Sequence, residues 1–319
     1  MPRHAGFVPS GVIPAVLLPF NEDFSIDEAS YRAHLRDVAA TRGISALTVN
    51  AHSTEAASCS FDEQVRVLAI TDDEIGARLP IVNGIYADGS LEAQRLAKMA
   101  HAGGASALLV FPSAIYTMGQ RPEMAIEHFK RIAEVTDLPL IAFQYQLAGG
   151  QGYPLPTLIR MIEAVPTIRA IKDWCANPQM HERQIRLLQA RTPVVNVLST
   201  HSAWLMSSLV LGCNGLLSGS GSVIADLQAQ LFRAVQANDL AAARRINDRI
   251  WPTAEVFYAD PPVDMHNRMK EALVLLGKLP RAVVRPPLAK LGDAEIARIR
   301  AALVAAGLLG GNAAVRKAA

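Results

Sequence analysis

Short apolar runs alternate with longer mixed segments along most of this chain. The apolar runs cover residues 12–18, 46–50, 80–84, 107–111, 140–143, 168–172, 194–198 and 215–218. They are almost continuously apolar, which is typical of strands that are covered on both faces. The segments between them are predicted to be helical, starting with 27–40, and Ser60 with Glu63 predicts a capping box at one helix start. The pattern predicts parallel strands joined by crossover helices.

Eight such units that close on themselves form an α/β fold, the (β/α)8 TIM barrel. Further helices are predicted between residues 240 and 306, including 264–276 and 293–306, as a C-terminal helical extension packed on the barrel or on a partner subunit. Residues 1–223 would hold the barrel strands and the catalytic face. Residues 224–319 would hold the last barrel helix and the extension, within a single structural unit. The small, basic segment 310–319 is expected to be frayed.

Composition narrows the class of protein. The chain has 319 residues, of which 50% are hydrophobic, and a formal net charge of +2. No basic run with interleaved aromatic residues indicates nucleic-acid binding, and no stretch of eighteen apolar residues predicts a membrane span. The three cysteines are widely spaced without a CxxC motif, and the amino terminus lacks a signal-peptide core. These features predict a cytoplasmic protein with reduced thiols.

Lys172 is the main candidate for chemistry. It ends the apolar run 168–172, and active sites of such barrels lie at the carboxyl ends of the strands. A lysine in that position can be desolvated, which lowers its pKa, and a neutral amine can form a Schiff base with a carbonyl substrate. The alternative is a lysine whose side chain leaves the sheet and extends to water. The predicted barrel favours the catalytic interpretation.

Several short motifs occur in an order that resembles one family, the dihydrodipicolinate synthase and N-acetylneuraminate lyase family of class I, Schiff-base-forming aldolases. The resemblance extends from about Gly11 to Leu291. The motifs are Asp62-Glu63-Gln64, Thr136 to Ile141, Ile171-Lys172-Asp173, Met269 to Leu273, and Arg285-Pro286-Pro287-Leu288.

The resemblance implies a barrel with a helical tail, assembled as a homotetramer that is a dimer of dimers. It also implies a covalent imine between Lys172 and pyruvate or another 2-keto acid, with no metal and no cofactor. The expected function is therefore that of a lyase, either an aldolase or a dehydratase. Two alternatives stay open: a barrel that binds a 2-keto acid without turnover, and dihydrodipicolinate synthase itself.

The loop after the second strand departs from the family pattern Gly-x-x-Gly-Glu, because it reads Ala51-His52-Ser53-Thr54-Glu55. Ser53 and Thr54 are expected to hold the carboxylate of the keto acid. His52 takes the place of a Ser or Thr of the family's proton relay. It could act as an acid or base near neutral pH, or it could only donate a hydrogen bond.

The second departure lies on the fifth strand, where Phe143 occupies the position of the family's catalytic tyrosine. Tyr145 is two residues further on and points to the same side, because side chains alternate along a strand. It could supply the missing hydroxyl or be a wall of the pocket, and Gln144 adds an amide. The segment 147–152 contains no arginine to match the one that many synthases use, which argues against dihydrodipicolinate synthase itself.

Other clusters are assigned smaller roles. Ser218 and Gly219, in a glycine-rich turn after the eighth strand, are predicted to line the keto-acid site, since such turns can hold anions. His201 either lines the barrel mouth or caps a helix. Asp260, Asp264 and His266 resemble metal ligands, but the intervening Pro261-Pro262 favours an ordinary loop, and no metal site is predicted.

Overall fold

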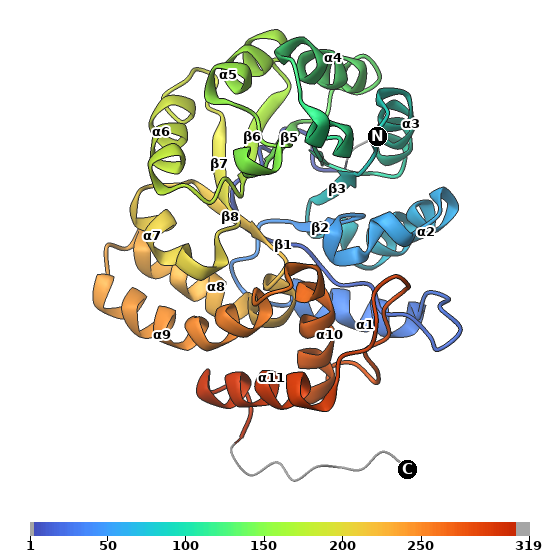
Figure 1. Cartoon of the computed structure of the whole chain (residues 1–319), viewed down its shortest axis with the longest axis vertical. Helices are drawn as coiled ribbons and strands as arrows, with labels where there is room; N and C mark the ends of the chain where they lie inside the picture. Colours follow the sequence, from blue (N-terminus) through green and yellow to red (C-terminus); the bar gives the residue numbers. More distant parts are fainter. Residues whose placement is uncertain (1–2, 311–319) are drawn as a thin grey trace.

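The computed structural model describes residues 3–310 and contains a closed barrel of eight parallel strands (Figure 1). The strands are β1 Gly11–Pro14, β2 Leu47–Val49, β3 Ile81–Ile85, β4 Ala107–Val110, β5 Leu140–Gln144, β6 Ile168–Asp173, β7 Asn196–Ser199 and β8 Gly215–Ser218. From β2 to β8 each strand pairs with the next in sequence, and β1 pairs with β8. Parallel bridges from Val12 to Ile44 and from Ala15 to Thr48 close the barrel between β1 and β2. The predicted (β/α)8 TIM barrel is confirmed.

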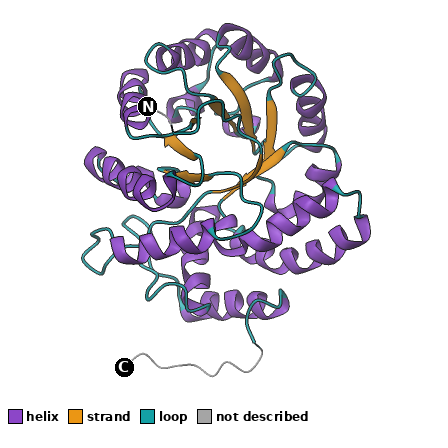
Figure 2. Ribbon diagram, turned by 180° about the vertical axis from the view of Figure 1, so that it is seen from behind, coloured by secondary structure: helices purple, strands orange, loops and turns teal. Residues whose placement is uncertain are grey.

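Helices surround the strands on the outside (Figure 2). The barrel helices are α1 Glu28–Ala39, α2 Phe61–Thr71, α3 Ser90–Ala102, α4 Pro122–Ala133, α5 Leu155–Ala164, α6 Pro178–Leu188, α7 Leu205–Val210 and α8 Gly221–Gln236. Helix α2 starts at the predicted capping box: the Ser60 hydroxyl accepts from the Glu63 N–H, and the Glu63 carboxylate accepts from the Ser60 N–H. Asp27 caps α1 in a similar way by accepting from the Ser30 N–H. These caps fix the residues at which α1 and α2 begin after the strands that precede them.

Alternation along the strands divides the core into two parts. One apolar cluster fills the barrel interior and includes Ile13, Leu109, Ile141, Ala170 and Leu217. The larger cluster lies between the outer faces of the strands and the helices. Since residues two apart share a face, Phe143 and Lys172 point inward with Ile141 and Ala170.

The predicted C-terminal helical extension is also present, as α9 Leu240–Phe257, α10 Met265–Leu275 and α11 Asp293–Ala305. Helix α10 lies beside the barrel mouth near β1 (Figure 1). The buried Arg268 of α10 holds α11 through Glu295 at 2.6 Å and donates to the Ala259 carbonyl at 2.6 Å. The division predicted after residue 223 stays a prediction, and α8 spans it.

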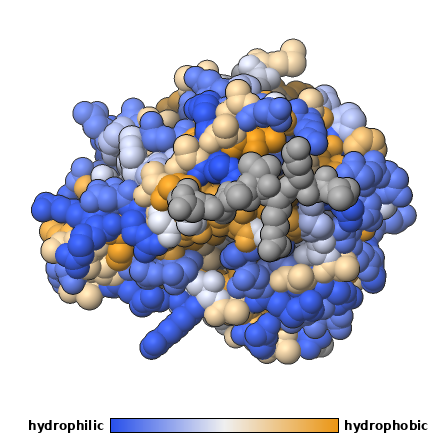
Figure 3. All heavy atoms as spheres, turned by 90° about the horizontal axis from the view of Figure 1, so that it is seen from below, coloured by the Kyte–Doolittle hydropathy of each residue, from blue (hydrophilic) through white to orange (hydrophobic). Residues whose placement is uncertain are grey.

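The outer surface is mixed. On the face seen from below, hydrophilic residues predominate and hydrophobic ones lie between them in several places (Figure 3). Among the helices of residues 3–310, none is long and apolar enough to cross a membrane. The predicted fraying of 310–319 lies, apart from Gly310, outside the described residues.

Candidate active site

The loop after β2 carries His52 and Ser53 to the carboxyl end of the barrel. Asn50 leaves the strand with a positive φ of 51°, and its amide donates to the Gln64 carbonyl at 2.9 Å and to Asn83 Oδ1 at 2.8 Å. Gly84 of β3 permits the approach of this turn, because a Cβ there would lie 2.0 Å from the Asn50 carbonyl oxygen. These contacts hold the short helix His52–Thr54 directly after the end of β2.

Lys172 lies beside Phe143 inside the barrel. The two residues are register partners on β6 and β5, and the Lys172 Nζ is 4.0 Å from the centre of the Phe143 ring. Within residues 3–310 the amine forms no ion pair or hydrogen bond, and its side chain is buried. Burial lowers the pKa of Lys172 to about 7, since no nearby carboxylate compensates for the lost water. A large share of the amine is therefore neutral at physiological pH.

His52, which lies near this lysine, forms a hydrogen-bonded pair with Tyr145. The Tyr145 hydroxyl and the His52 Nε2 are 3.1 Å apart, and the Tyr145 ring packs against Phe143 with 4.5 Å between ring centres. Burial and the neighbouring Lys172 lower the pKa of His52 to about 3, so its ring is neutral at neutral pH. Burial raises the pKa of Tyr145, so its hydroxyl keeps its proton. The simplest arrangement has the hydroxyl donating to the neutral imidazole.

A cavity of about 50 Å³ lies beside Lys172 and His52. Its wall includes His52, Ser53, Phe143, Lys172 and Gly219. The Ser53 hydroxyl is buried and has no hydrogen-bond partner in the part of the chain that the structure describes. A buried hydroxyl without a partner is costly, so this one is available to a bound acceptor such as a carboxylate.

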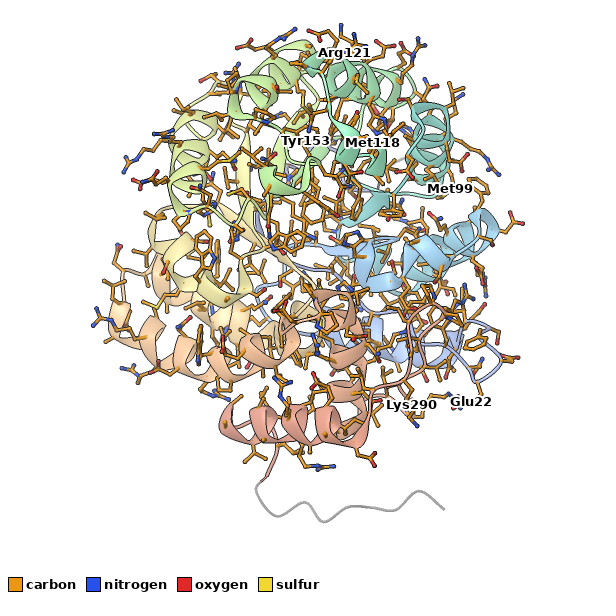
Figure 4. All side chains as sticks on the ribbon, viewed as in Figure 1. Glu22, Met99, Met118, Arg121, Tyr153 and Lys290 are labelled. Atoms are coloured by element: carbon orange, nitrogen blue, oxygen red, sulfur yellow. The ribbon has the colours of Figure 1, made fainter. Side chains whose placement is uncertain are left out.

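Four residues that the sequence placed at the site do not line this cavity. Tyr145 packs against two lining residues, Phe143 and His52, and the other three are engaged elsewhere. The Thr54 hydroxyl bonds to the Ala51 N–H at 2.7 Å and to the Ala51 carbonyl at 2.9 Å, inside its own loop. The Gln144 side chain points out of the barrel and pairs at both ends with the backbone of Tyr153, which Figure 4 labels between β5 and α5. Ser218 bonds to Ser202 at 3.1 Å and to Ser220 at 2.9 Å.

A buried ion pair links the loop after β2 to the C-terminal extension. The Lys270 amine of α10 bonds to the Glu55 carboxylate and also donates to the Val283 carbonyl at 2.8 Å. The Glu55 carboxylate in addition accepts from the Arg285 N–H at 3.1 Å. Glu55 therefore anchors the extension over the barrel mouth, next to His52.

The residues best placed to hold a metal lie behind Lys172. Ligand atoms of Asp173, Cys175 and His201, all buried, lie within 4.8 Å of one another. The Asp173 carboxylate is already engaged, because it accepts from the His181 Nδ1 at 2.6 Å and from the Cys175 N–H at 2.8 Å. His201 thus lies in this cluster behind the strand end, stacked on Trp204 with ring centres 4.0 Å apart.

Sequence reasoning missed part of the cavity wall. Trp174, Tyr258, Met265 and His266 also line it, the last three from the connection between α9 and α10 and the start of α10. His266, which had been considered as a metal ligand, lies against Gly219, where an added Cβ would be 2.9 Å from its Nε2. Of these four residues, only Trp174 could have been predicted to line the cavity, because it follows Lys172 by two positions on the same strand end. The other three approach through long-range packing that no local pattern reports.

Comparison with known proteins agrees with this arrangement. The model of the dihydrodipicolinate synthetase family matches residues 8–306. The chain belongs to this family. A 4-hydroxy-tetrahydrodipicolinate synthase from Dechloromonas aromatica is 30% identical over 303 residues, which are 94% of this chain and 99% of the relative. The protein is accordingly a lyase of the aldolase type.

Solved structures share the fold. YagE, a prophage protein of the dihydrodipicolinic acid synthase family from E. coli K12 solved in complex with pyruvate, superimposes with a TM-score of 0.86 at 22% identity, over 94% of this chain and 99% of its own. A monomeric dihydrodipicolinate synthase variant gives a TM-score of 0.86 at 23% identity, over 94% of this chain and 98% of its own.

Proposed function

We propose that this protein is a Schiff-base lyase, an aldolase or dehydratase, that acts on pyruvate or another 2-keto acid through Lys172. The observation that carries the proposal is the buried Lys172 amine, which has no partner among residues 3–310 and faces a cavity at the carboxyl end of the barrel. Its pKa of about 7 makes it a nucleophile at neutral pH. The pyruvate in the YagE structure supports the choice of substrate class.

In the proposed reaction, the neutral Lys172 amine attacks the C2 carbonyl of the keto acid. The resulting carbinolamine loses water and becomes an iminium ion. The iminium then accepts the electron pair released when a proton leaves C3 or when a bond at C3 breaks. The Ser53 hydroxyl, which lacks a partner within the described residues, donates to the substrate carboxylate. A cationic iminium replaces the neutral amine over the Phe143 ring, whose face favours positive charge.

Proton transfer is assigned to the pair of Tyr145 and His52. The two groups are hydrogen-bonded at 3.1 Å and both are neutral, so the pair gives up a proton to the carbinolamine hydroxyl as it leaves, and the negative charge left on the pair is balanced by the positive charge that forms on the iminium. This pair replaces the hydroxyl that Phe143 lacks. Loss of the carbinolamine hydroxyl as water requires such a donor, and general acid–base help of this kind contributes about 10²–10⁴-fold to a rate.

Exchange of the C3 hydrogens of pyruvate in D₂O separates a catalyst from a barrel that only binds. The proposal predicts exchange that depends on Lys172 and is lost in Lys172→Met. Binding of pyruvate without exchange above the rate in buffer would establish the non-catalytic alternative.

Dihydrodipicolinate synthase activity is the second candidate, favoured by the name of the curated relative. Ala148 and Gly149 stand in the segment after β5 where many synthases have an arginine for the carboxylate of the aldehyde. We therefore expect a slow rate with pyruvate and aspartate semialdehyde in a coupled assay. A rate equal to that of the preferred aldehyde would reverse this ranking.

The proposed setting of the enzyme is a homotetramer, a dimer of dimers, in the cytoplasm. The free thiols of Cys59, Cys175 and Cys213 support a reducing compartment. Exposed apolar side chains on the loops after β4 and β5 support self-association, since Ile115 is 55% and Met118 is 89% exposed.

A further inference from the structure

A second hollow of about 460 Å³ opens directly beside the cavity at Lys172. The two share His52, Trp174, Met265 and His266 as a common wall. The smaller cavity, of about 50 Å³, encloses the reacting amine, and the larger one falls within the usual size range of small-molecule sites. None of the steps assigned above uses the larger hollow.

The wall of this hollow is largely apolar. It is formed by the loop after β2 at Ala56 and Ala57, by Val263 before α10, and by the segment Pro286–Leu288 of the extension. Trp174 and Met265 complete it on the side of Lys172. A ligand that bridges the two spaces would thus meet a polar reactive end and an apolar far end.

The charged groups that border the hollow are already paired. The Glu55 carboxylate is held by Lys270 and by the Arg285 N–H. The Arg285 guanidinium donates to Glu63 and to the carbonyls of Phe24 and Ser58. Burial lowers the pKa of His266 well below its usual value, so this ring is neutral as well. A carboxylate on a ligand would find no unpaired cation among the described residues of this wall.

We propose that this hollow receives the aldehyde half of the substrate, and that this half carries an aryl or branched alkyl group instead of a carboxylate. The inference rests on the proposed Schiff-base function. In condensation, C3 of the enamine forms a bond to the aldehyde carbon, and the carbonyl electron pair moves to oxygen, which takes up a proton. Water then hydrolyses the iminium and releases Lys172 and a 4-hydroxy-2-keto acid. Cleavage is the reverse reaction.

The test measures kcat/KM for condensation of pyruvate with two apolar aldehydes, benzaldehyde and 3-methylbutanal, and with two carboxylate-bearing ones, glyoxylate and succinic semialdehyde. The expected result is a preference of at least tenfold for the apolar pair. An equal or reversed preference would overturn the inference, and so would turnover of none of the four aldehydes.

Val263 offers a variant at the rim of the hollow, because its side chain is 63% exposed and can be replaced without disturbing the core. Val263→Asp is expected to lower kcat/KM for benzaldehyde at least tenfold, mainly through KM, and Val263→Arg is expected to raise kcat/KM for glyoxylate. The matched control is Val304→Asp on α11, which is 39% exposed and outside the hollow. Unfolding midpoints equal to the wild-type value are checked first.

Two failures are distinguishable. Absence of a borohydride-trapped pyruvate adduct on the wild-type protein contradicts the proposed function, and the inference falls with it. An adduct together with a preference for carboxylate-bearing aldehydes, or with Val263 variants that keep wild-type kinetics for every aldehyde, contradicts the inference alone.

Discussion

Lys172 combines reactivity with a cost to the fold. Its amine is held inside the barrel against the Phe143 ring, 4.0 Å from the ring centre, and no carboxylate of the described residues pairs with it. A lysine in water has an ordinary pKa of about 10.5, whereas burial lowers the pKa of Lys172 to about 7. Such a shift is a difference in free energy between the folded and unfolded chains, so the function proposed for this residue comes at the expense of stability.

Replacing Lys172 by Met should therefore stabilise the protein. The folded state releases the Lys172 proton near pH 7 and the unfolded state near pH 10.5, so the unfolded chain binds more protons between these values and wild-type stability rises with pH there. We expect Lys172→Met to gain on the order of 5 kcal/mol below pH 7, with the gain shrinking toward pH 10.5. Denaturant unfolding over this pH range measures it.

The control is Lys130→Met, because Lys130 is exposed on α4 and its replacement should change stability by about 0.5 kcal/mol or less at every pH. A Lys172→Met protein that is less stable than the wild type, or whose gain in stability does not depend on pH, would show that burial does not lower the pKa of Lys172.

The position of the site hydroxyl gives a second prediction. Tyr145→Phe should slow C3 exchange of pyruvate by about 10²–10⁴-fold, because it removes the proton donor while leaving the pocket shape intact. Adding Phe143→Tyr to this variant should raise its exchange rate at least tenfold, since the change places a hydroxyl beside Lys172. Tyr86→Phe is the control, as its ring also packs on His52, at 5.5 Å between centres. An exchange rate within twofold of wild type for Tyr145→Phe would assign Tyr145 to the pocket wall alone.

Elements of the fold were more predictable than the contacts between them. The strand positions followed from the apolar runs, and the capping box at Ser60 was confirmed, because both depend on nearby residues. The first strand was predicted over 12–18 but pairs as β1 only over Gly11–Pro14. The residues that follow it leave the sheet, with a single bridge from Ala15 to Thr48.

The candidate site shows the same division. The inward direction of Lys172, Phe143 and Tyr145 follows from strand alternation. The use of the Gln144 amide by the Tyr153 backbone, and of the Thr54 hydroxyl by Ala51, depends on loop conformations that a sequence pattern does not specify. The approach of His266 depends on how α10 packs over the barrel mouth.

The ion pair between Lys270 and Glu55 connects α10 to the loop after β2, and both of its side chains are buried. Lys270→Met should destabilise the protein by about 3–5 kcal/mol, because the Glu55 carboxylate would be left buried without its partner amine. Lys278→Met is the control, since its pair with Asp37 is 2.8 Å long but exposed, and should cost about 1 kcal/mol or less. Equal decreases in the free energy of unfolding for the two variants, measured by urea unfolding, would show that the buried pair contributes no more to stability than the exposed one.

At the scale of the whole molecule, the barrel leaves apolar side chains on the loops after β4 and β5, among them Met118, which Figure 4 labels. In a homotetramer, a neighbouring subunit is expected to cover an apolar surface of this kind. Sedimentation should give a tetramer for the wild type and a smaller species for Ile115→Glu with Met118→Glu. Leu240→Glu on α9, 44% exposed, is the control. A wild-type monomer over micromolar concentrations would contradict the assembly.

The central claim, that Lys172 forms an imine with a 2-keto acid, is tested most directly by trapping. The protein is incubated with pyruvate and sodium borohydride, digested, and the peptides are analysed by mass spectrometry. The account predicts one reduced pyruvyl group on the peptide that contains Lys172 and none in Lys172→Met, whose buried Lys270 remains as an internal comparison. An unmodified Lys172 after treatment with pyruvate and with larger 2-keto acids would contradict it.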